Sequence, residues 1–131
     1  MPLRFSVVVP ARNRPHTLTH TLRTCLAQDF DDYQVVVSDN SQGSAIGEVA
    51  ARADSPRVKY VRTPRALAMT DSWEFAVSQA DGEFVTVLGE DDGLAPYSLP
   101  AIDALLRQSG AELLRWESAL YGWPDTADQR H

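Results

Sequence analysis

Short apolar runs with the composition of β-strands alternate along the chain with segments of helical periodicity. The apolar runs predict five strands, at Phe5–Val9, Gln34–Val37, Val58–Val61, Phe84–Leu88 and Glu112–Trp116. Between them, apolar residues recur every three or four positions, in the sets Leu18, Leu22, Cys25, Leu26; Ile46, Val49, Ala50, Ala53; Trp73, Ala76, Val77, Ala80; and Leu99, Ile102, Leu105, Leu106. Strands and helices in this order are typical of βαβ units. We therefore predict an α/β fold of the Rossmann-like type, with a parallel sheet and helices on its faces.

Polar residues and a glycine predict where three of these helices begin or end. Ser44 immediately precedes the second helical segment, which is the usual position of a helix N-cap. Asp71, followed three residues later by Glu74, has the pattern of a capping box and predicts the start of the third helix. Gly110 predicts the end of the fourth helix.

The composition limits the classes of protein to which the chain can belong. Its 131 residues suffice for one domain with a single core. The 18 acidic and 12 basic residues give a net charge of −6, which disfavours nucleic acid as a partner. Cys25 is the only cysteine, and no apolar run approaches the ~20 residues of a membrane span. We expect a cytoplasmic protein and leave open its peripheral association with the inner face of the membrane.

Two polar segments follow directly after predicted strands. Ser38–Ser41 follows Val35–Val37, and Glu90–Gly93 follows the strand that ends at Leu88. Because ligands of open parallel sheets bind at the carboxyl ends of the strands, we expect both segments to face one cleft. The adjacent carboxylates of Glu90–Asp92 repel one another unless a cation lies nearby, and a solvated turn is the alternative explanation. The two segments predict a site for a metal ion and a nucleotide.

The sequence contains neither of two common phosphate-binding motifs. It has no G-x-x-x-x-G-K-[ST] loop, and the turn after the first strand is Pro10–Pro15 in place of G-x-G-x-x-G. We therefore expect a divalent cation to neutralise the phosphate charge. Asp91 and Asp92 supply oxygen ligands for such a cation, and Gly93 gives the turn its freedom.

Three motifs, in this order, resemble glycosyltransferase family 2. They are V-V-V-P-A-R-N-R at the first strand, V-V-V-S-D-N-S at the second and G-E-F-V-T-V-L-G-E-D-D at the fourth. The resemblance covers residues 5 to about 125 and implies a GT-A fold, a nucleotide-sugar donor, Mn²⁺ or Mg²⁺, and inversion at the anomeric carbon. It also implies that residues 1–131 form the nucleotide-sugar-binding part of such a domain, truncated before the acceptor-binding half. The chain is polar after Pro124, so we expect 124–131 to be a frayed tail.

The resemblance assigns residues to the donor nucleotide. The turn of Pro10, Ala11, Arg12 and Asn13 matches the family loop that borders the base and ribose, with Arg12 where an aromatic residue is frequent. Asp39 matches the carboxylate that accepts the ring N–H of uracil. Since a carboxylate only accepts hydrogen bonds, it rejects the acceptor face of cytosine. The resemblance thus implies a uridine or thymidine donor.

The resemblance also assigns the diphosphate and the metal. Asp91 and Asp92 match the closing part of the family's D-x-D element, with Asp92 reaching the metal and Asp91 facing the ribose as a second candidate ligand. Gly89 stands where many members have the first aspartate. Arg62 or Arg65, after the third strand, matches a cation that some members place against the diphosphate. The sequence does not choose between the two arginines.

Other candidate residues have an ordinary structural explanation. His16 and His20 have the i, i+4 spacing of zinc ligands, but without a third ligand nearby we expect them to be exposed helix residues. Trp116, Tyr121 and Trp123 either stack on a sugar ring or pack against the sheet edge or an interface, and packing is slightly favoured.

No residue is predicted as the general base. The resemblance places the base in the acceptor-binding half, and Asp125 and Asp128 lie too early in the chain for this role. We therefore expect the front half of a transferase that acts on a glycan or a lipid-linked acceptor, with a homodimer left open. The alternative is a nucleotide or nucleotide-sugar binding module without turnover. A phosphoacceptor receiver domain is disfavoured because it needs a lysine late in the sheet, and Lys59 is the only lysine.

Overall fold

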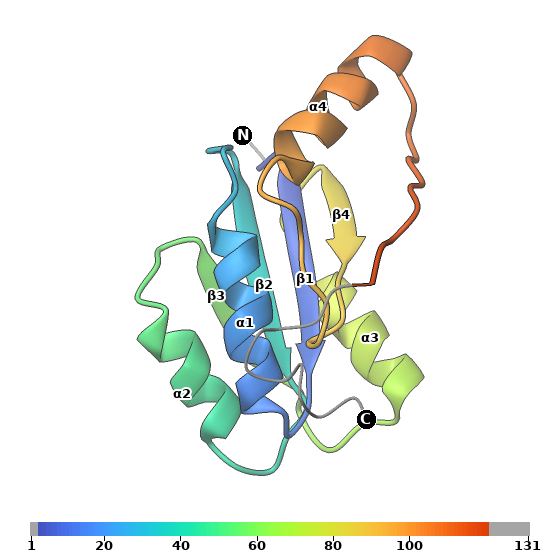
Figure 1. The fold of residues 1–131 in the computed structure, drawn as a ribbon. Coiled ribbons are helices and arrows are strands. Elements are labelled where there is room, and N and C mark those ends of the chain that lie inside the picture. The colour runs from blue at the N-terminus through green and yellow to red at the C-terminus, as the bar shows by residue number, and fades with distance from the viewer. Residues whose placement is uncertain (1–2, 121–131) are drawn as a thin grey trace.

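The computed structural model describes residues 3–120 and consists of a parallel sheet covered by helices (Figure 1). The elements alternate in the order β1 (Phe5–Ala11), α1 (Pro15–Leu26), β2 (Tyr33–Asp39), α2 (Ala45–Arg52), β3 (Val58–Arg62), α3 (Met69–Ser78), β4 (Phe84–Val87) and α4 (Ser98–Ser109). The sheet has four parallel strands in the order β3-β2-β1-β4. The predicted Rossmann-like α/β architecture is confirmed.

Strands β1 and β2 form the buried centre of the sheet. Every residue of both strands is buried, because each strand has a neighbour on either side and helices lie over the sheet. The register pairs Ala11 of β1 with Asp39 of β2, and Asp39 with Arg62 of β3. The carboxyl ends of these three strands therefore lie level with one another at one edge.

Two apolar clusters divide the helices between the faces of the sheet. The larger cluster joins Leu18 of α1, Ile46 of α2 and Leu99 of α4 to the odd-numbered residues of β1 and β2. The smaller cluster joins the opposite face of the same strands to Ala76 of α3. Successive side chains of a strand point to opposite faces, so α1, α2 and α4 cover one face and α3 covers the other (Figure 1).

The turn before β4 is fixed by a close approach of its backbone to β1. A Cβ atom on Gly82 would lie 2.5 Å from the Ser6 amide nitrogen, so a side chain there requires a backbone shift. The Gly82 N–H donates to Ser6 Oγ at 2.8 Å, and Gln34 Oε1 accepts from Ser6 Oγ at 2.7 Å and from the Asp81 N–H at 2.8 Å. The Asp-Gly-Glu segment at 81–83 therefore has a structural role in joining this turn to the sheet.

The fifth predicted strand is wrong. Glu112–Trp116 is irregular, and Leu113 within it is 84% exposed. A strand needs a neighbour for its backbone groups, and within residues 3–120 this segment pairs with no strand.

The helix boundaries agree with the sequence at two of three places. Ser44 is the N-cap of α2, and Gly110 ends α4 with a positive φ of 66°. Helix α3, however, begins at Met69, because the Ser72 N–H already bonds to the Ala68 carbonyl at 2.9 Å. Asp71 therefore lies inside the first turn of α3 and not at its N-cap.

Candidate functional site

Hydrogen bonds join the loops that follow β1, β2 and β4 at the carboxyl edge of the sheet. The Arg12 N–H donates to the Glu90 carboxylate at 2.8 Å, and the Asn13 N–H donates to Ser41 Oγ at 2.8 Å. The turn after β1 thus contacts both polar segments that the sequence singled out. These segments lie at one edge of the sheet, as expected from parallel pairing.

The four predicted residues of this turn differ in accessibility. Pro10 and Ala11 are buried at the end of β1, whereas Arg12 and Asn13 are exposed. Asn13 has a φ of 57°, a left-handed conformation that asparagine tolerates better than most residues. Arg12 and Asn13 are therefore the members of this turn that are accessible from solvent.

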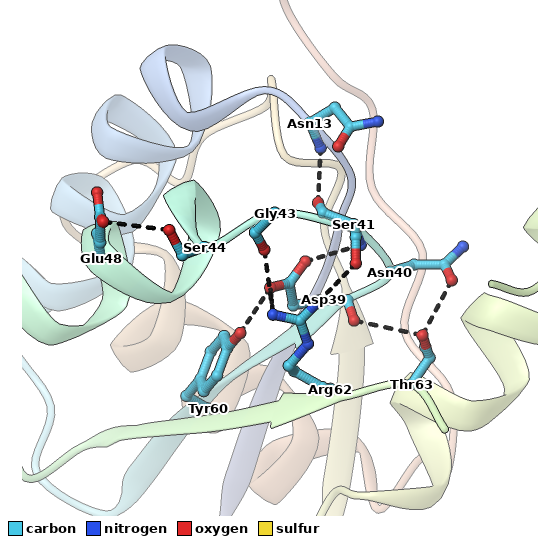
Figure 2. A network of polar contacts seen from close by, with 10 residues as sticks. All are labelled: Asn13, Asp39, Asn40, Ser41, Gly43, Ser44, Glu48, Tyr60, Arg62 and Thr63. Carbon is cyan, nitrogen blue, oxygen red and sulfur yellow. Dashed lines mark hydrogen bonds and ion pairs between the residues drawn. The ribbon is translucent and has the colours of Figure 1, made fainter. Parts of the chain in front are cut away.

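Asp39, predicted to recognise the base, is a buried carboxylate with a donor on each oxygen (Figure 2). Its Oδ1 accepts the Ser41 N–H at 2.8 Å, and its Oδ2 accepts the Tyr60 hydroxyl at 2.5 Å. Burial is the largest cause that raises the pKa of Tyr60, and the bond to Asp39 adds to it, so the phenol remains a donor at neutral pH. The side chain of Asp39 has 0% exposure, so access to it requires a neighbour to move.

Arg62 lies beside Asp39 and binds the turn that follows β2. Its guanidinium donates to the Ser41 carbonyl at 2.8 Å and to the Gly43 carbonyl at 3.1 Å, and it lies 3.8 Å from Asp39 Oδ2 (Figure 2). Its side chain is nevertheless 43% exposed. Arg65 is an exposed residue of the loop between β3 and α3. Of the two predicted arginines, Arg62 is the one that contacts the candidate site.

Asn40 organises the loop between β3 and α3, a role that the sequence did not predict. Its side-chain amide donates to the Leu67 carbonyl at 2.9 Å, and its Oδ1 accepts the Leu67 N–H at 2.9 Å and the Thr63 hydroxyl at 3.0 Å. Its own N–H donates to the Ala11 carbonyl at 2.9 Å. The one available signal was its position directly after Asp39.

The carboxylates of Asp91 and Asp92 converge over the backbone of Gly89. A Cβ atom on Gly89 would lie 2.7 Å from Asp92 Oδ2 and 3.1 Å from Asp91 Oδ1. A first aspartate at this position would therefore displace both carboxylates. Arg14 pairs with Asp91 at 3.3 Å, with both side chains about half exposed, so this ion pair contributes little to stability.

Polar side chains of α1, and Gln28 just after its end, hold the acidic segment from the interior. The Thr21 hydroxyl lies 2.8 Å from the Glu90 carbonyl and 2.5 Å from the Asp92 carbonyl, and it donates to one of them at a time. Thr24 Oγ1 accepts the Leu94 N–H at 3.1 Å, and the Gln28 amide donates to the Ala95 carbonyl at 2.8 Å. The sequence did not predict a role for these residues. The available signal was polar side chains at i, i+3 and i+7, of which Thr21 and Thr24 adjoin the apolar Leu22 and Cys25 in α1.

Glu90 is the least exposed of the three carboxylates in the acidic segment, and its pKa is raised. Burial raises the pKa of Glu90, while the hydrogen bond from the Arg12 N–H and the charge of Arg14 oppose that shift. Glu90 is thus held between the turn after β1 and α1. Glu90 therefore has a structural role in the loop, whereas the carboxylates of Asp91 and Asp92 lie near Gly89.

Metal ligation remains a prediction. Within residues 3–120, His, Cys, Asp and Glu side chains form no group of three that could hold a metal ion by themselves. His16 is exposed and His20 half-buried on α1, and their rings make an edge contact at 5.1 Å. Asp91 and Asp92 are the pair whose carboxylates approach one point.

The family model of Glycosyl transferase family 2 matches residues 6–123. The chain belongs to this family. Among its relatives, the GalNAc(5)-diNAcBac-PP-undecaprenol beta-1,3-glucosyltransferase of Campylobacter jejuni is 30% identical over 76% of this chain and 33% of its own length. The succinoglycan biosynthesis protein ExoO of Rhizobium meliloti is 26% identical over 81% of this chain and 30% of its own length. The chain therefore spans about a third of the length of these relatives.

Solved structures of S. aureus TarS share the fold of this family 2 chain. TarS 1-349 in complex with UDP matches with a TM-score of 0.75 and 26% identity, over 82% of this chain and 33% of that chain. TarS 1-349 in complex with UDP-GlcNAc matches with a TM-score of 0.72 and 25% identity, over 82% and 32% of the two chains. The predicted GT-A fold is confirmed, and family membership decides against a receiver domain.

Several expectations for this family 2 chain concern residues at its C-terminal end. Trp116 is 52% exposed, so its predicted packing against a sheet edge is not realised within residues 3–120. Tyr121, Trp123, Asp125 and Asp128 lie outside the described residues. In the part of the chain that the structure describes, no helix is long and apolar enough to cross a membrane.

Proposed function

We propose that this chain forms the donor-binding part of an inverting glycosyltransferase. The donor is a uridine or thymidine diphosphate sugar, and the acceptor is a glycan or a lipid-linked saccharide. The observation that carries the proposal is that Asp39 and the Glu90–Asp92 segment lie at the same carboxyl edge of one parallel sheet. The turn after β1 hydrogen-bonds both to Glu90 and to Ser41, next to Asp39. The named specificity of the Campylobacter relative and the UDP complexes of TarS support the choice of substrates.

The base end of the donor site is built around Asp39. A carboxylate accepts the ring N–H of uracil or thymine and has no donor for cytosine. Because Asp39 is fully buried and Arg62 is about two-fifths exposed, Arg62 is the neighbour that a nucleotide displaces. The released guanidinium then lies close enough to compensate the negative charge of the diphosphate.

The phosphate end is built around Asp91 and Asp92. Two carboxylates on one turn, completed by phosphate oxygens, are a common way of binding Mg²⁺, and Mn²⁺ accepts the same ligands. The convergence of both carboxylates over Gly89 fits such a cation. When bound, the cation would stabilise charge on the diphosphate leaving group. Thr21 holds the backbone from which these carboxylates project.

The two ends of the site account for donor binding but not for activation of the acceptor. Within residues 3–120 no carboxylate is assigned as general base. Transfer therefore requires a base supplied by an acceptor-binding half. A nucleotide-sugar binding module without turnover is the second candidate function, since it needs only the donor site.

The proposal is tested by the metal dependence of nucleotide binding. Calorimetry of the chain with uridine diphosphate should give clear binding with Mn²⁺ and much weaker binding with a chelator. Asp92→Asn keeps the shape of the side chain while removing its charge, so it should weaken Mn²⁺-dependent binding with little change in melting temperature. Glu112→Gln, an exposed charge removal outside the site, is the matched control. Equal affinity with Mn²⁺ and with chelator would refute the metal assignment.

A further inference from the structure

The phenol of Tyr60 contacts the carboxylate that we assign to base recognition. Tyr60 Oη donates to Asp39 Oδ2 at 2.5 Å, opposite the Ser41 N–H that donates to Oδ1 at 2.8 Å (Figure 2). Each carboxylate oxygen therefore has one fixed donor and retains one acceptor position. Both donors come from the protein, so the orientation of Asp39 is set before any ligand arrives.

The two β3 side chains beside Asp39 lie at different depths in the sheet. Arg62 pairs with Asp39 at the end of the strands, whereas Tyr60 pairs with Val37, two residues further from the edge. Residues two apart in a strand lie on the same face, so Tyr60 and Arg62 both face α2. A ligand that enters at the carboxyl edge therefore meets Arg62 before it reaches Tyr60.

Helix α2 accommodates the phenol through a glycine. A Cβ atom on Gly47 would lie 3.0 Å from Tyr60 Oη and 3.2 Å from Tyr60 Cζ. Contacts this short are tighter than ordinary packing, so a larger residue at position 47 would require the phenol to shift by a few tenths of an ångström. The absence of a side chain at Gly47 thus leaves room for the hydroxyl of Tyr60.

We propose that Tyr60 is a positioning residue for recognition of a uracil-type base. Its hydroxyl, together with the Ser41 N–H, fixes the plane of the Asp39 carboxylate so that the acceptor position on the Arg62 side meets the ring N–H. Without the hydroxyl, the Ser41 N–H would be the one remaining donor of the pair to hold the Asp39 carboxylate, whose terminal torsion is intrinsically broad. This inference rests on the proposed function, since Asp39 reads a base only if the chain binds a nucleotide.

The test compares Tyr60→Phe with a matched tyrosine elsewhere. Tyr33→Phe is the control, because the Tyr33 hydroxyl likewise donates a hydrogen bond, to the Cys25 carbonyl at 2.9 Å, and is remote from Asp39. Tyr33 is buried, whereas Tyr60 is 37% exposed. Calorimetry with uridine and cytidine diphosphates in Mn²⁺ should show Tyr60→Phe binding uridine diphosphate about fivefold to tenfold more weakly. This is less than the loss of a direct hydrogen bond to a charged group, because Tyr60 acts on the base only through Asp39. The uridine-to-cytidine preference should fall with it. Tyr33→Phe should leave both values unchanged.

Gly47→Ala provides a second variant that leaves Tyr60 and Asp39 intact. Alanine favours the helix, so α2 should not be weakened, while the hydroxyl of Tyr60 is displaced. We expect Gly47→Ala to reduce uridine diphosphate affinity in the native chain and to have no further effect in the Tyr60→Phe background.

The outcomes separate this inference from the proposed function. If native protein prefers uridine over cytidine diphosphate and both variants keep that preference and affinity, Tyr60 does not position Asp39. The proposed donor site would be unaffected by that result. Tighter binding by Tyr60→Phe would mean that the phenol competes with the base, and it would also overturn the inference. If native protein shows no preference between the two nucleotides, the base assignment and the role of Tyr60 fail together.

Discussion

Asp39 has features of both a turn residue and a binding residue. Its bond to the Ser41 N–H is the i to i+2 contact of an ordinary Asx turn. Its bond to Tyr60 and its complete burial exceed what a turn requires. Burying a carboxylate costs free energy unless hydrogen bonds satisfy it, and an exposed aspartate would form the same turn without that cost. The extra burial therefore favours a role in ligand recognition.

Replacement of Asp39 should change base preference more than overall fold. Asp39→Ala should weaken binding of uridine diphosphate by about 1.5–3 kcal/mol, the contribution of a hydrogen bond to a charged group. Asp39→Asn retains the shape but offers an amide donor, so it should bind cytidine diphosphate relatively better. Competition calorimetry with the two nucleotides measures both effects. An unchanged preference for uridine over cytidine diphosphate in both variants would show that Asp39 is only a turn residue.

At the scale of elements, α1 serves two sides of the fold. Leu18, Leu22 and Cys25 pack into the core, and burial raises the pKa of the Cys25 thiol to about 12, so it remains protonated. Thr21 and Gln28 of the same region instead bond to the backbone around the acidic segment. One helix thereby couples core packing to the position of the candidate metal ligands.

Removal of the Thr21 hydroxyl should loosen the acidic segment. Thr21→Val keeps the branched shape and leaves the Glu90 and Asp92 carbonyls without this donor, which should cost about 1 kcal/mol of unfolding free energy. Mn²⁺-dependent binding of uridine diphosphate should weaken severalfold. Thr19→Val is the control, because Thr19 is exposed and its hydroxyl donates to the Pro15 carbonyl of its own helix. Urea denaturation and calorimetry measure the two effects, and equal behaviour of both variants would contradict this role of Thr21.

At the scale of the molecule, exposed apolar side chains gather at the end of the described chain. Leu105 of α4 is 54% exposed, Leu113 is 84% exposed and Trp116 is 52% exposed. A contiguous exposed patch of apolar side chains is typical of a surface that packs against another segment or partner. The proposed function calls for an acceptor-binding half, which is a partner that such a surface would fit.

The 131-residue chain alone should bind the donor without transferring sugar efficiently. General-base catalysis typically contributes a factor of about 10²–10⁴ in rate, and orientation of the acceptor contributes more. Incubation with uridine and thymidine diphosphate sugars and simple glycan acceptors, followed by mass spectrometry, should detect slow donor hydrolysis at most. Robust glycoside formation would show that a general base lies within this chain.

The sequence by itself determined the strand and helix order, because apolar periodicity and strand composition are local properties. It also placed Asp39, Asp91 and Asp92 at strand ends, since parallel strands joined by helices bring their carboxyl ends to one edge. The capping signals at Ser44 and Gly110 held for the same local reason. Family membership followed from motifs whose spacing reflects this topology.

Tertiary structure alone decided which residues touch across elements. Whether Glu112–Trp116 forms a strand depends on a neighbouring strand, which local composition does not specify. The hydrogen bond from Tyr60 to Asp39 joins β3 to β2, and Gly47 of α2 lies against the same phenol. The hydrogen bond from Thr21 to the acidic segment spans about 70 positions of sequence. Burial of Asp39 likewise arises from the packing of Tyr60 and Arg62 around it. Such contacts depend on the register of strands and the docking of helices, so they become visible only when the chain is folded.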